Sequence, residues 1–257
     1  MYSKKEEFVA ELLGSMVLFL FGAGVVACVI LFENGTALSI HIAWGLAVIF
    51  GIYVSGKITG AHLNPAITIA LATTKRFPWS KVCYYIIAQL IGFFIAAAIV
   101  FFIYHKKWIE VDPLLSNTAG ILTTFPTING FWTGLFDQIL GTFLLMFLVL
   151  ACGDTNNTPA GANLAPIIVG LIVVVIGTSF GTLHGYAINP ARDFAPRVFA
   201  TLAGFKNNGL TDGTNVWIVP ILGPIIGAIL GAILYDLTIG KTLKKHNENN
   251  NELKGRV

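Results

Sequence analysis

The hydrophobic and polar positions of this chain separate into long uncharged runs joined by short polar segments. Four runs carry no Asp, Glu, Lys or Arg: Asn34 to Gly56, Val82 to His105, Thr155 to Ala191 and Gly213 to Tyr235. A helix needs about 20 mostly apolar residues to cross a lipid bilayer. Several of these runs are therefore long enough to span a membrane, and the third is too long for one span.

The runs divide into six full spans and two shorter apolar segments that cannot cross a bilayer alone. The spans are expected near Phe8–Leu31, Ile40–Ser55, Val82–Tyr104, Phe131–Ala151, Leu164–Ser179 and Val216–Tyr235. The short helices are expected near Pro65–Thr74 and Pro190–Leu202. The first span is longer than the apolar core of a signal peptide and contains Glu11, so we interpret it as a retained span.

Composition supports an all-α membrane protein and argues against other classes. Apolar residues make up 55% of the chain and charged residues 11%, against about 25% charged residues in ordinary soluble domains. Such a chain could not present a charged surface to water on all sides. The three cysteines lie apart, at Cys28, Cys83 and Cys152, so the sequence predicts neither a disulfide framework nor a metal site. No cofactor is expected.

The Lys and Arg residues indicate the orientation of the chain. If both termini are cytoplasmic, eleven of these residues lie inside and five outside, which fits the positive-inside bias. We therefore expect a multi-pass protein of the plasma membrane. Residues 1–7 form a cytoplasmic N-terminus, 8–240 a single membrane domain, and 241–257 a polar, disordered cytoplasmic tail. The basic tail is interpreted as a topology signal, and no nucleic-acid partner is expected.

An internal repeat divides the membrane domain into two halves. The motif Gly-x-x-x-Asn-Pro-Ala begins at Gly60 and again at Gly185, an offset of 125 residues. The halves are 8–105 and 131–240, joined by a connecting loop over 106–130. Three full spans in each half is an odd number, so the second half must run inverted. Interrupted apolar segments at matching positions of inverted repeats point to a substrate path at the bilayer midplane.

Each motif places Asn-Pro-Ala at the start of a short helix. The two turns are Asn64, Pro65 and Ala66, and Asn189, Pro190 and Ala191. An Asn side chain can cap free backbone N–H groups, and Pro at the first helical position has no N–H to satisfy. If both helices begin at the midplane, their positive ends face each other, each worth about half an elementary charge. Cations then meet a barrier, whereas a neutral hydroxyl can accept a hydrogen bond from the Asn amides.

The residues before each turn are expected to be extended and to offer carbonyl acceptors to passing hydroxyls. These residues are Gly60, Ala61, His62 and Leu63 in the first half, and Gly185, Tyr186, Ala187 and Ile188 in the second.

These motifs, with Arg192 directly after the second turn, resemble the major intrinsic protein (aquaporin) family. Gly60–Ala66 reads Gly-Ala-His-Leu-Asn-Pro-Ala and Asn189–Phe194 reads Asn-Pro-Ala-Arg-Asp-Phe, and the similarity covers Glu7 to Lys241. The chain is most similar to the aquaglyceroporin, or glycerol uptake facilitator, branch. The resemblance implies a right-handed bundle of six transmembrane helices plus two re-entrant half-helices, assembled as a homotetramer. It also implies a passive channel for glycerol, water and other small uncharged solutes such as urea or dihydroxyacetone, which excludes ions and protons.

Four positions correspond by spacing to the narrowest point of this family: Trp44, Gly177, Tyr186 and Arg192. Water-selective members have His where Gly177 stands, so Gly177 implies a wider slot. Trp44 and Tyr186 would offer aromatic faces to a carbon backbone, and Arg192 would bind its hydroxyls, because an Arg within a membrane is usually functional. Glycerol facilitators often have Phe in place of Tyr186, whose hydroxyl would narrow the slot or add a hydrogen bond. A structural ion pair of Arg192 with Asp193 is the alternative.

The resemblance also implies buried side chains that support the loops leading into the half-helices. Glu11 matches the family's buried Glu of the first span. Gln138 stands at the equivalent position of the second half, with Asp137 beside it as an uncertain substitute, and Asp193 is expected as a further support.

Three other functions are weighed against this one. A mainly water-selective aquaporin would differ at the narrowest point, and a secondary transporter would need an ion-coupling carboxylate in the path. An intramembrane enzyme would need a nucleophile or metal constellation, which the sequence does not suggest, so no catalysis is expected. His184, near the outer mouth, is a candidate for pH sensitivity.

Overall fold

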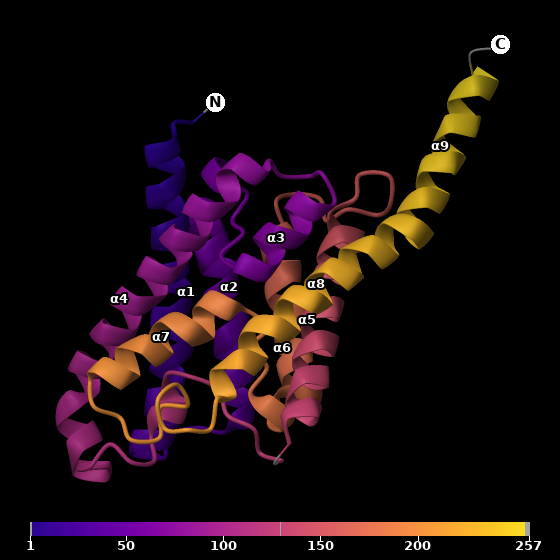
Figure 1. The fold of residues 1–257 in the computed structure, drawn as a ribbon. Helices are drawn as coiled ribbons and strands as arrows, with labels where there is room; N and C mark the ends of the chain where they lie inside the picture. The colour runs from indigo at the N-terminus through magenta and orange to yellow at the C-terminus, as the bar shows by residue number, and fades with distance from the viewer. Residues whose placement is uncertain (1, 129, 255–257) are drawn as a thin grey trace.

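The computed structural model describes residues 2–128 and 130–254 (Figure 1). Within these residues, six helices are long and apolar enough to cross a membrane. The spans are α1 (Lys4–Phe32), α2 (Ala37–Thr59), α4 (Trp79–Val111), α5 (Phe131–Gly153), α6 (Ala165–His184) and the continuous helical stretch Val216–Asn249, which contains α8 (Val219–Tyr235). Two short helices, α3 (Pro65–Thr73) and α7 (Pro190–Leu202), lie between them. The predicted fold class is confirmed.

Most spans extend beyond the apolar runs that predicted them. Helix α1 begins at Lys4 because Ser3 and Glu6 form a capping box before the apolar run starts. Helix α4 continues to Val111, well into the expected connecting loop. Single 3₁₀ turns, η1 (Ala119–Ile121) and η2 (Val216–Ile218), interrupt the loops that precede α5 and α8. Residue 129 of the connecting loop lies outside the described residues.

The two halves of the repeat exchange their short helices. Within the first half α1 packs against α2 and α4, and within the second α5 packs against α6 and α8. Helix α3, however, packs mainly against α8, and α7 packs mainly against α4 (Figure 1). Each short helix therefore packs mainly against the opposite half.

The halves also meet directly, where α2 packs against α6. A Cβ atom added at Gly45 would lie 2.7 Å from the carbonyl oxygen of Gly170, and one added at Gly170 would lie 2.5 Å from that of Gly45. Small residues allow this close backbone approach between helices in membranes. The two glycines occupy equivalent positions of the repeat, so the contact lies on the pseudo-two-fold axis.

Apolar side chains cover the outside of the bundle as well as its core. Phe102 and Ile103 on α4 are 69% and 72% exposed, for example, and Trp132 on α5 is 67% exposed. A contiguous apolar exterior of this kind is unfavourable in water and suits a lipid environment.

The C-terminal tail differs from expectation because it is helical. Helix α8 continues through the π-helical turn η3 (Asp236–Gly240) into α9 (Lys241–Lys254), which leaves the bundle at the end where α1 begins (Figure 1). The stretch from Lys241 to Lys254 contains no Gly or Pro. Its four Lys and two Glu are good helix formers, whereas its four Asn are weaker ones. Because α9 continues an existing helix, it does not have to form a new helical nucleus, which is the unfavourable step. The composition of the tail does not reveal this. Residues 255–257 of the expected tail lie outside the described residues.

Candidate functional site

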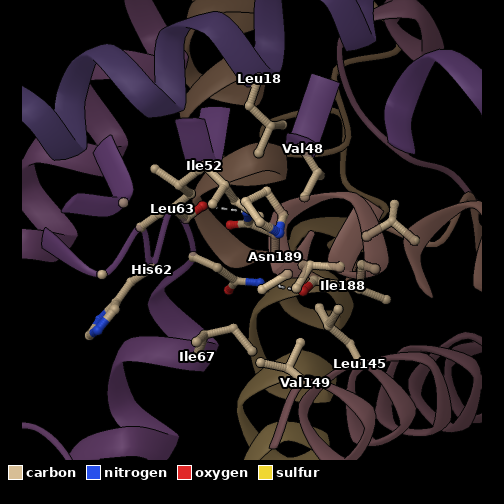
Figure 2. Close-up of a pocket in the computed structure, with 18 of the residues that line it drawn as sticks. Leu18, Val48, Ile52, His62, Leu63, Ile67, Leu145, Val149, Ile188 and Asn189 are labelled. Atoms are coloured by element: carbon tan, nitrogen blue, oxygen red, sulfur yellow. Dashed lines mark hydrogen bonds between the residues drawn. The ribbon is translucent and has the colours of Figure 1, made fainter. Parts of the chain in front are cut away.

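The two Asn-Pro-Ala turns meet at the centre of the bundle and are linked to each other. The Asn64 side-chain oxygen accepts a hydrogen bond from the Ala66 N–H at 2.9 Å, and the Asn189 oxygen accepts from Ala191 and Arg192 at 3.1 Å each. Both residues therefore cap their helices as the sequence predicted. The other end of each amide crosses to the opposite half: Asn64 Nδ2 donates to the Ile188 carbonyl at 2.8 Å, and Asn189 Nδ2 donates to that of Leu63 at 2.7 Å (Figure 2).

A cavity of about 650 Å³ passes along these turns between the two halves. Its wall is mostly apolar and includes Leu18, Val48, Ile52, Ile67, Leu145 and Val149 (Figure 2). The polar groups on the wall are fewer. They are the two Asn amides, the backbone of the two loops, the cations Lys57 and Arg192, and the side chains of Tyr53, His62, Asn163 and Tyr186. Each Asn amide group has two N–H donors, and one of them donates to the opposite loop. The other remains available to the cavity.

The loops before the turns are not extended strands, which corrects the expectation from sequence. Four residues have φ in the left-handed region: Ala61 (51°), Leu63 (50°), Tyr186 (33°) and Ile188 (42°). This conformation costs a residue other than glycine about 1–3 kcal/mol, yet it recurs at equivalent positions of both halves. Within residues 2–128 and 130–254, no protein donor reaches the carbonyl oxygens of His62 or Ala187. Both residues line the cavity, and a carbonyl-lined path along it remains a prediction.

The four residues expected at the narrowest point, Trp44, Gly177, Tyr186 and Arg192, form one group, here called the aromatic–Arg cluster. Trp44, Tyr186 and Arg192 all line the cavity. The guanidinium carbon of Arg192 lies 4.1 Å from the centroid of the Trp44 ring, a cation–π contact, and 5.6 Å from that of Phe19. Its Nη1 atom donates to the Leu122 carbonyl at 3.1 Å. Phe19 and Leu122 were not predicted, because no sequence motif marks them.

Gly177 lies behind the Tyr186 and His41 rings, whereas the sequence suggested that it would leave open space at the narrowest point. A Cβ atom added there would lie 2.8 Å from the Tyr186 ring and 2.9 Å from the His41 ring. The space left by the glycine is thus filled by these two rings, and Gly177 is not among the described residues that line the cavity. His41 was not assigned a role from sequence, although its position one helical turn before Trp44 was a signal that it would share the same helix face.

Glu11 and Gln138 support the two loops in equivalent ways. Glu11 Oε1 accepts from the Leu63 N–H at 2.5 Å, and Gln138 Oε1 accepts from the Ile188 N–H at 2.8 Å. Asp137 contacts the Gln138 amide, at 3.3 Å, and does not replace it as the loop support. Both supporting side chains are fully buried.

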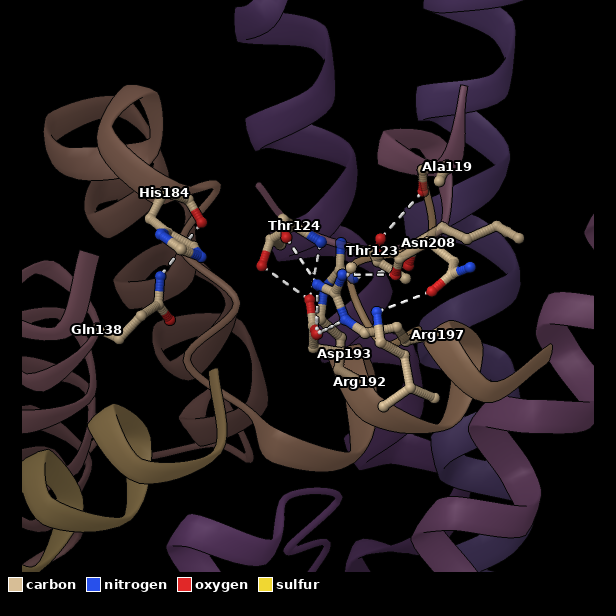
Figure 3. Close-up of polar contacts among 12 residues, drawn as sticks. Ala119, Thr123, Thr124, Gln138, His184, Arg192, Asp193, Arg197 and Asn208 are labelled. Carbon is tan, nitrogen blue, oxygen red and sulfur yellow. Dashed lines mark hydrogen bonds and ion pairs between the residues drawn. The ribbon is translucent and has the colours of Figure 1, made fainter. Parts of the chain in front are cut away.

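Asp193 supports a different segment, the chain around Thr124 that precedes α5. Its Oδ2 atom accepts from the Thr124 N–H and hydroxyl, both at 2.7 Å, and its Oδ1 atom accepts from Arg197 Nε at 2.9 Å (Figure 3). Arg197 donates in turn to the carbonyls of Thr124 at 2.7 Å and Asn208 at 2.9 Å. The buried ion partner of Asp193 is therefore Arg197. This leaves the Arg192 guanidinium directed to the cavity.

A second cavity, of about 680 Å³, lies beside the first where α5, α8 and α9 meet. Its charged groups are mostly paired with each other: Arg76 with Asp236, and the Tyr235 hydroxyl with Asp154 at 2.8 Å. The backbone N–H of Asn156, which follows the end of α5, lowers the pKa of Asp154. This cavity joins the tail helix to the bundle, and no sequence motif indicates a ligand for it.

The Major intrinsic protein family model matches residues 1–235. The chain belongs to this family. It is 43% identical over 220 residues to a protein named probable glycerol uptake facilitator protein of Thermotoga maritima, a match that covers 84% of this chain and 92% of that one. It is 44% identical over 209 residues to a protein named Aquaporin-10 of Milnesium tardigradum, of which the match spans about half the length, 51%, and 77% of this chain. Among solved structures, the X-ray structure of the aquaglyceroporin from Plasmodium falciparum is similar, with a TM-score of 0.85 and 31% identity over 94% of this chain and 99% of that chain.

Proposed function

We propose that this member of the major intrinsic protein family is a passive channel for glycerol, water and other small uncharged solutes. The observation that carries the proposal is the cavity itself. Its wall is mostly apolar, and the polar groups on it include the Asn64 and Asn189 amides, backbone carbonyls of the two loops and Arg192. A linear polyol has one face of CH groups and one of hydroxyls, and this wall offers a surface for each.

Neutral solutes pass the centre because donors and acceptors replace their water shell. The free N–H groups of Asn64 and Asn189 donate to a hydroxyl oxygen, and the loop carbonyls accept its hydrogen. Ions are excluded because α3 and α7 direct their positive ends to the same point, where a cation has already lost its hydration. A water molecule held there donates away from the centre in both directions, which interrupts proton conduction. Dipoles and lining groups acting together are the established basis of selectivity in aquaporin-type channels.

The aromatic–Arg cluster selects among the neutral solutes. Trp44 and Tyr186 provide apolar faces for the carbon backbone, and Arg192 donates to the hydroxyls. Arg192 is only 7% exposed, so each of its hydrogen bonds to a permeant acts in a site with little competing water.

A channel explains the buried carboxylates better than an ion-coupled carrier does. Glu11 is held by Leu63, Asp193 by Arg197, and Asp137 by Gln138. Among the described residues that line the cavity there is no Asp or Glu that could couple a cation to transport.

We place the protein in the plasma membrane as a homotetramer, with both termini in the cytoplasm and one path in each subunit. The positive-inside bias and the shared end of α1 and α9 support this orientation. Native mass spectrometry of the detergent-solubilised protein tests the assembly, and a purely monomeric species at micromolar concentration would contradict it.

The test of the proposed function is stopped-flow light scattering of proteoliposomes in an inward gradient of glycerol. Water exit first shrinks the vesicles, and glycerol entry then makes them swell again. Wild-type protein is expected to speed glycerol entry well above protein-free liposomes, without saturation as the gradient rises. Cys152 lines the cavity and so provides a control. A mercurial reagent should block the flux, Cys152→Ser should resist the block, and Cys83→Ser, at an exposed position away from the cavity, should remain sensitive. Glycerol entry at the protein-free rate would refute the proposal.

A further inference from the structure

His41 on α2 lies beside the aromatic–Arg cluster, where α2 packs against α6. It lies three residues before Trp44, so the two side chains project from neighbouring turns of one helix face. Its Nδ1 atom is 2.9 Å from the Tyr186 hydroxyl, and the two rings meet edge to face with centroids 5.2 Å apart. The imidazole is half-buried.

The Tyr186 ring packs against two glycines of α6, Gly177 and Gly181, which the His41 ring also contacts. A Cβ atom at Gly177 would lie 2.8 Å from the ring, and one at Gly181 would lie 2.7 Å from it. The ring therefore lies flat against glycine backbone and cannot retreat further from the cavity. The α6 backbone thus confines one face of the ring, and His41 holds its hydroxyl end.

The hydrogen bond also decides what the Tyr186 hydroxyl can offer to a permeant. A neutral imidazole has one nitrogen that accepts, and a phenol has one O–H donor and free lone pairs. When Nδ1 accepts, the single hydrogen of the hydroxyl is used and its oxygen is left as an acceptor. The cavity then has a donor at Arg192 and an acceptor at Tyr186 in the same cluster.

We propose that His41 is a fifth specificity-determining residue of this cluster, acting as a positioning residue through Tyr186. By fixing the ring and its hydroxyl, it limits the cross-section open to a permeant and presents an acceptor to hydroxyl-bearing solutes. This inference rests on the proposed channel function. It adds to the residues that touch the solute a residue, His41, that orients Tyr186. Gly177 and Gly181 belong to the same arrangement, because they provide the surface against which the Tyr186 ring packs.

The test compares the entry of erythritol, a longer polyol, with that of glycerol in proteoliposomes. His41→Ala frees the ring and opens space, so the erythritol-to-glycerol permeability ratio should rise by about fivefold, the factor that one ordinary hydrogen bond corresponds to. His41→Phe keeps a ring but cannot accept the hydrogen, and Tyr186→Phe removes the hydroxyl, so each should raise the ratio in the same direction. Because one hydrogen bond is lost in every case, combining His41→Phe with Tyr186→Phe should add nothing to either change alone.

Ile42→Ala is the matched control, since this neighbouring side chain of α2 is 44% exposed on the outside of the bundle. It should leave the ratio at the wild-type value. A purely structural role for His41 would lower the entry of both solutes by the same factor and leave the ratio unchanged, which would overturn the inference. Multiplicative effects of His41→Phe and Tyr186→Phe would also overturn it. Failure of the proposed function is distinguishable, because the wild-type protein itself would then admit no glycerol.

Discussion

The two loops that lead into the short helices have the same backbone and different supports. In the first loop, the Leu63 N–H donates to the carboxylate of Glu11, which also accepts from Gln89 Nε2 at 2.8 Å. In the second, the equivalent Ile188 N–H donates to the neutral amide of Gln138. The left-handed residues recur at the same positions in both. The loop geometry therefore requires one acceptor oxygen for the N–H of Leu63 or Ile188. That oxygen can belong to a carboxylate or to a neutral amide.

The loops also differ in what they contribute to the cavity. Tyr186 and Arg192 belong to the second loop and helix, and the equivalent positions of the first half are Ala61 and Ile67. The first loop instead anchors a polar network, in which Gln89 also donates to Thr68. Duplication has thus kept a shared scaffold while the first half provides support and the second provides most of the discrimination.

The largest effect is expected from removing the charged support. Glu11→Ala would leave the Leu63 N–H and one N–H of the Gln89 amide buried without an acceptor, at about 1–3 kcal/mol for each group. Helix α3 and its loop should then lose their fixed position, and the yield of folded protein in membranes should fall sharply. Fluorescence-detected size exclusion and thermal unfolding in detergent measure this loss.

Glu110→Ala is the matched control for Glu11→Ala. Glu110 is a surface residue that pairs with Lys107 at 3.2 Å, and such exposed pairs contribute little. Normal yield and thermal stability of Glu11→Ala would show that the loop is held by its packing instead.

The next largest effect is expected on selectivity, from the residue that the first half lacks. Arg192→Val makes the second half resemble the first, where an aliphatic side chain stands at the equivalent position. The loss of a buried charged donor should change the glycerol-to-urea permeability ratio by about tenfold, and protons should begin to leak. Solute entry and the decay of a pH gradient measure the two effects, with Lys107→Ala as an exposed control. An unchanged glycerol-to-urea ratio together with an intact proton barrier would show that Arg192 does not contribute to selectivity.

Sequence could predict the scaffold because its signals are local or repeated. The spans follow from uncharged runs, and the capping roles of Asn64 and Asn189 follow from an Asn-Pro pair that starts a helix. Equivalence between the halves even located Gln138 as the second loop support. Each of these properties can be inferred from a short stretch of residues or from the equivalent stretch in the other half.

The rest depends on contacts between segments that are far apart in the chain. The His41–Tyr186 bond joins residues 145 positions apart, and the Arg192–Leu122 bond joins residues 70 positions apart. Neither has a motif, and the partners meet only because α2 packs on α6 and the connecting loop lies over α7. The left-handed loops were missed for a related reason, since they are imposed by supports that come from other helices.

A smaller, local effect is expected at Gly177. The equivalent position of the first half is Ile52, which lines the cavity, so the second half requires a glycine where the first carries a large side chain. Gly177→Ala would place a methyl group against the Tyr186 ring and push it toward the cavity. Glycerol entry should fall by several-fold while water entry changes less, as stopped-flow light scattering can show. Gly24→Ala, on α1 with no neighbouring atom within 4 Å of its Cβ position, should leave both rates unchanged, and equal losses for both solutes at Gly177 would indicate misfolding instead of narrowing.

The smallest effect is expected when the two loops exchange their supporting chemistry. Glu11→Gln retains an oxygen for the Leu63 N–H but removes the charge, so it should cost about 1 kcal/mol, the difference between a charge-assisted and an ordinary hydrogen bond. Gln138→Glu retains the oxygen for Ile188 but brings a second carboxyl beside Asp137, so it should be the less stable of the two variants. Both should keep the wild-type glycerol-to-urea ratio, because neither side chain touches the cavity wall. Thermal unfolding and solute entry measured on the same preparations separate the two properties. If Glu11→Gln were as damaging as Glu11→Ala, the charge and not the oxygen would be what the first loop requires, and the two loops would no longer be equivalent.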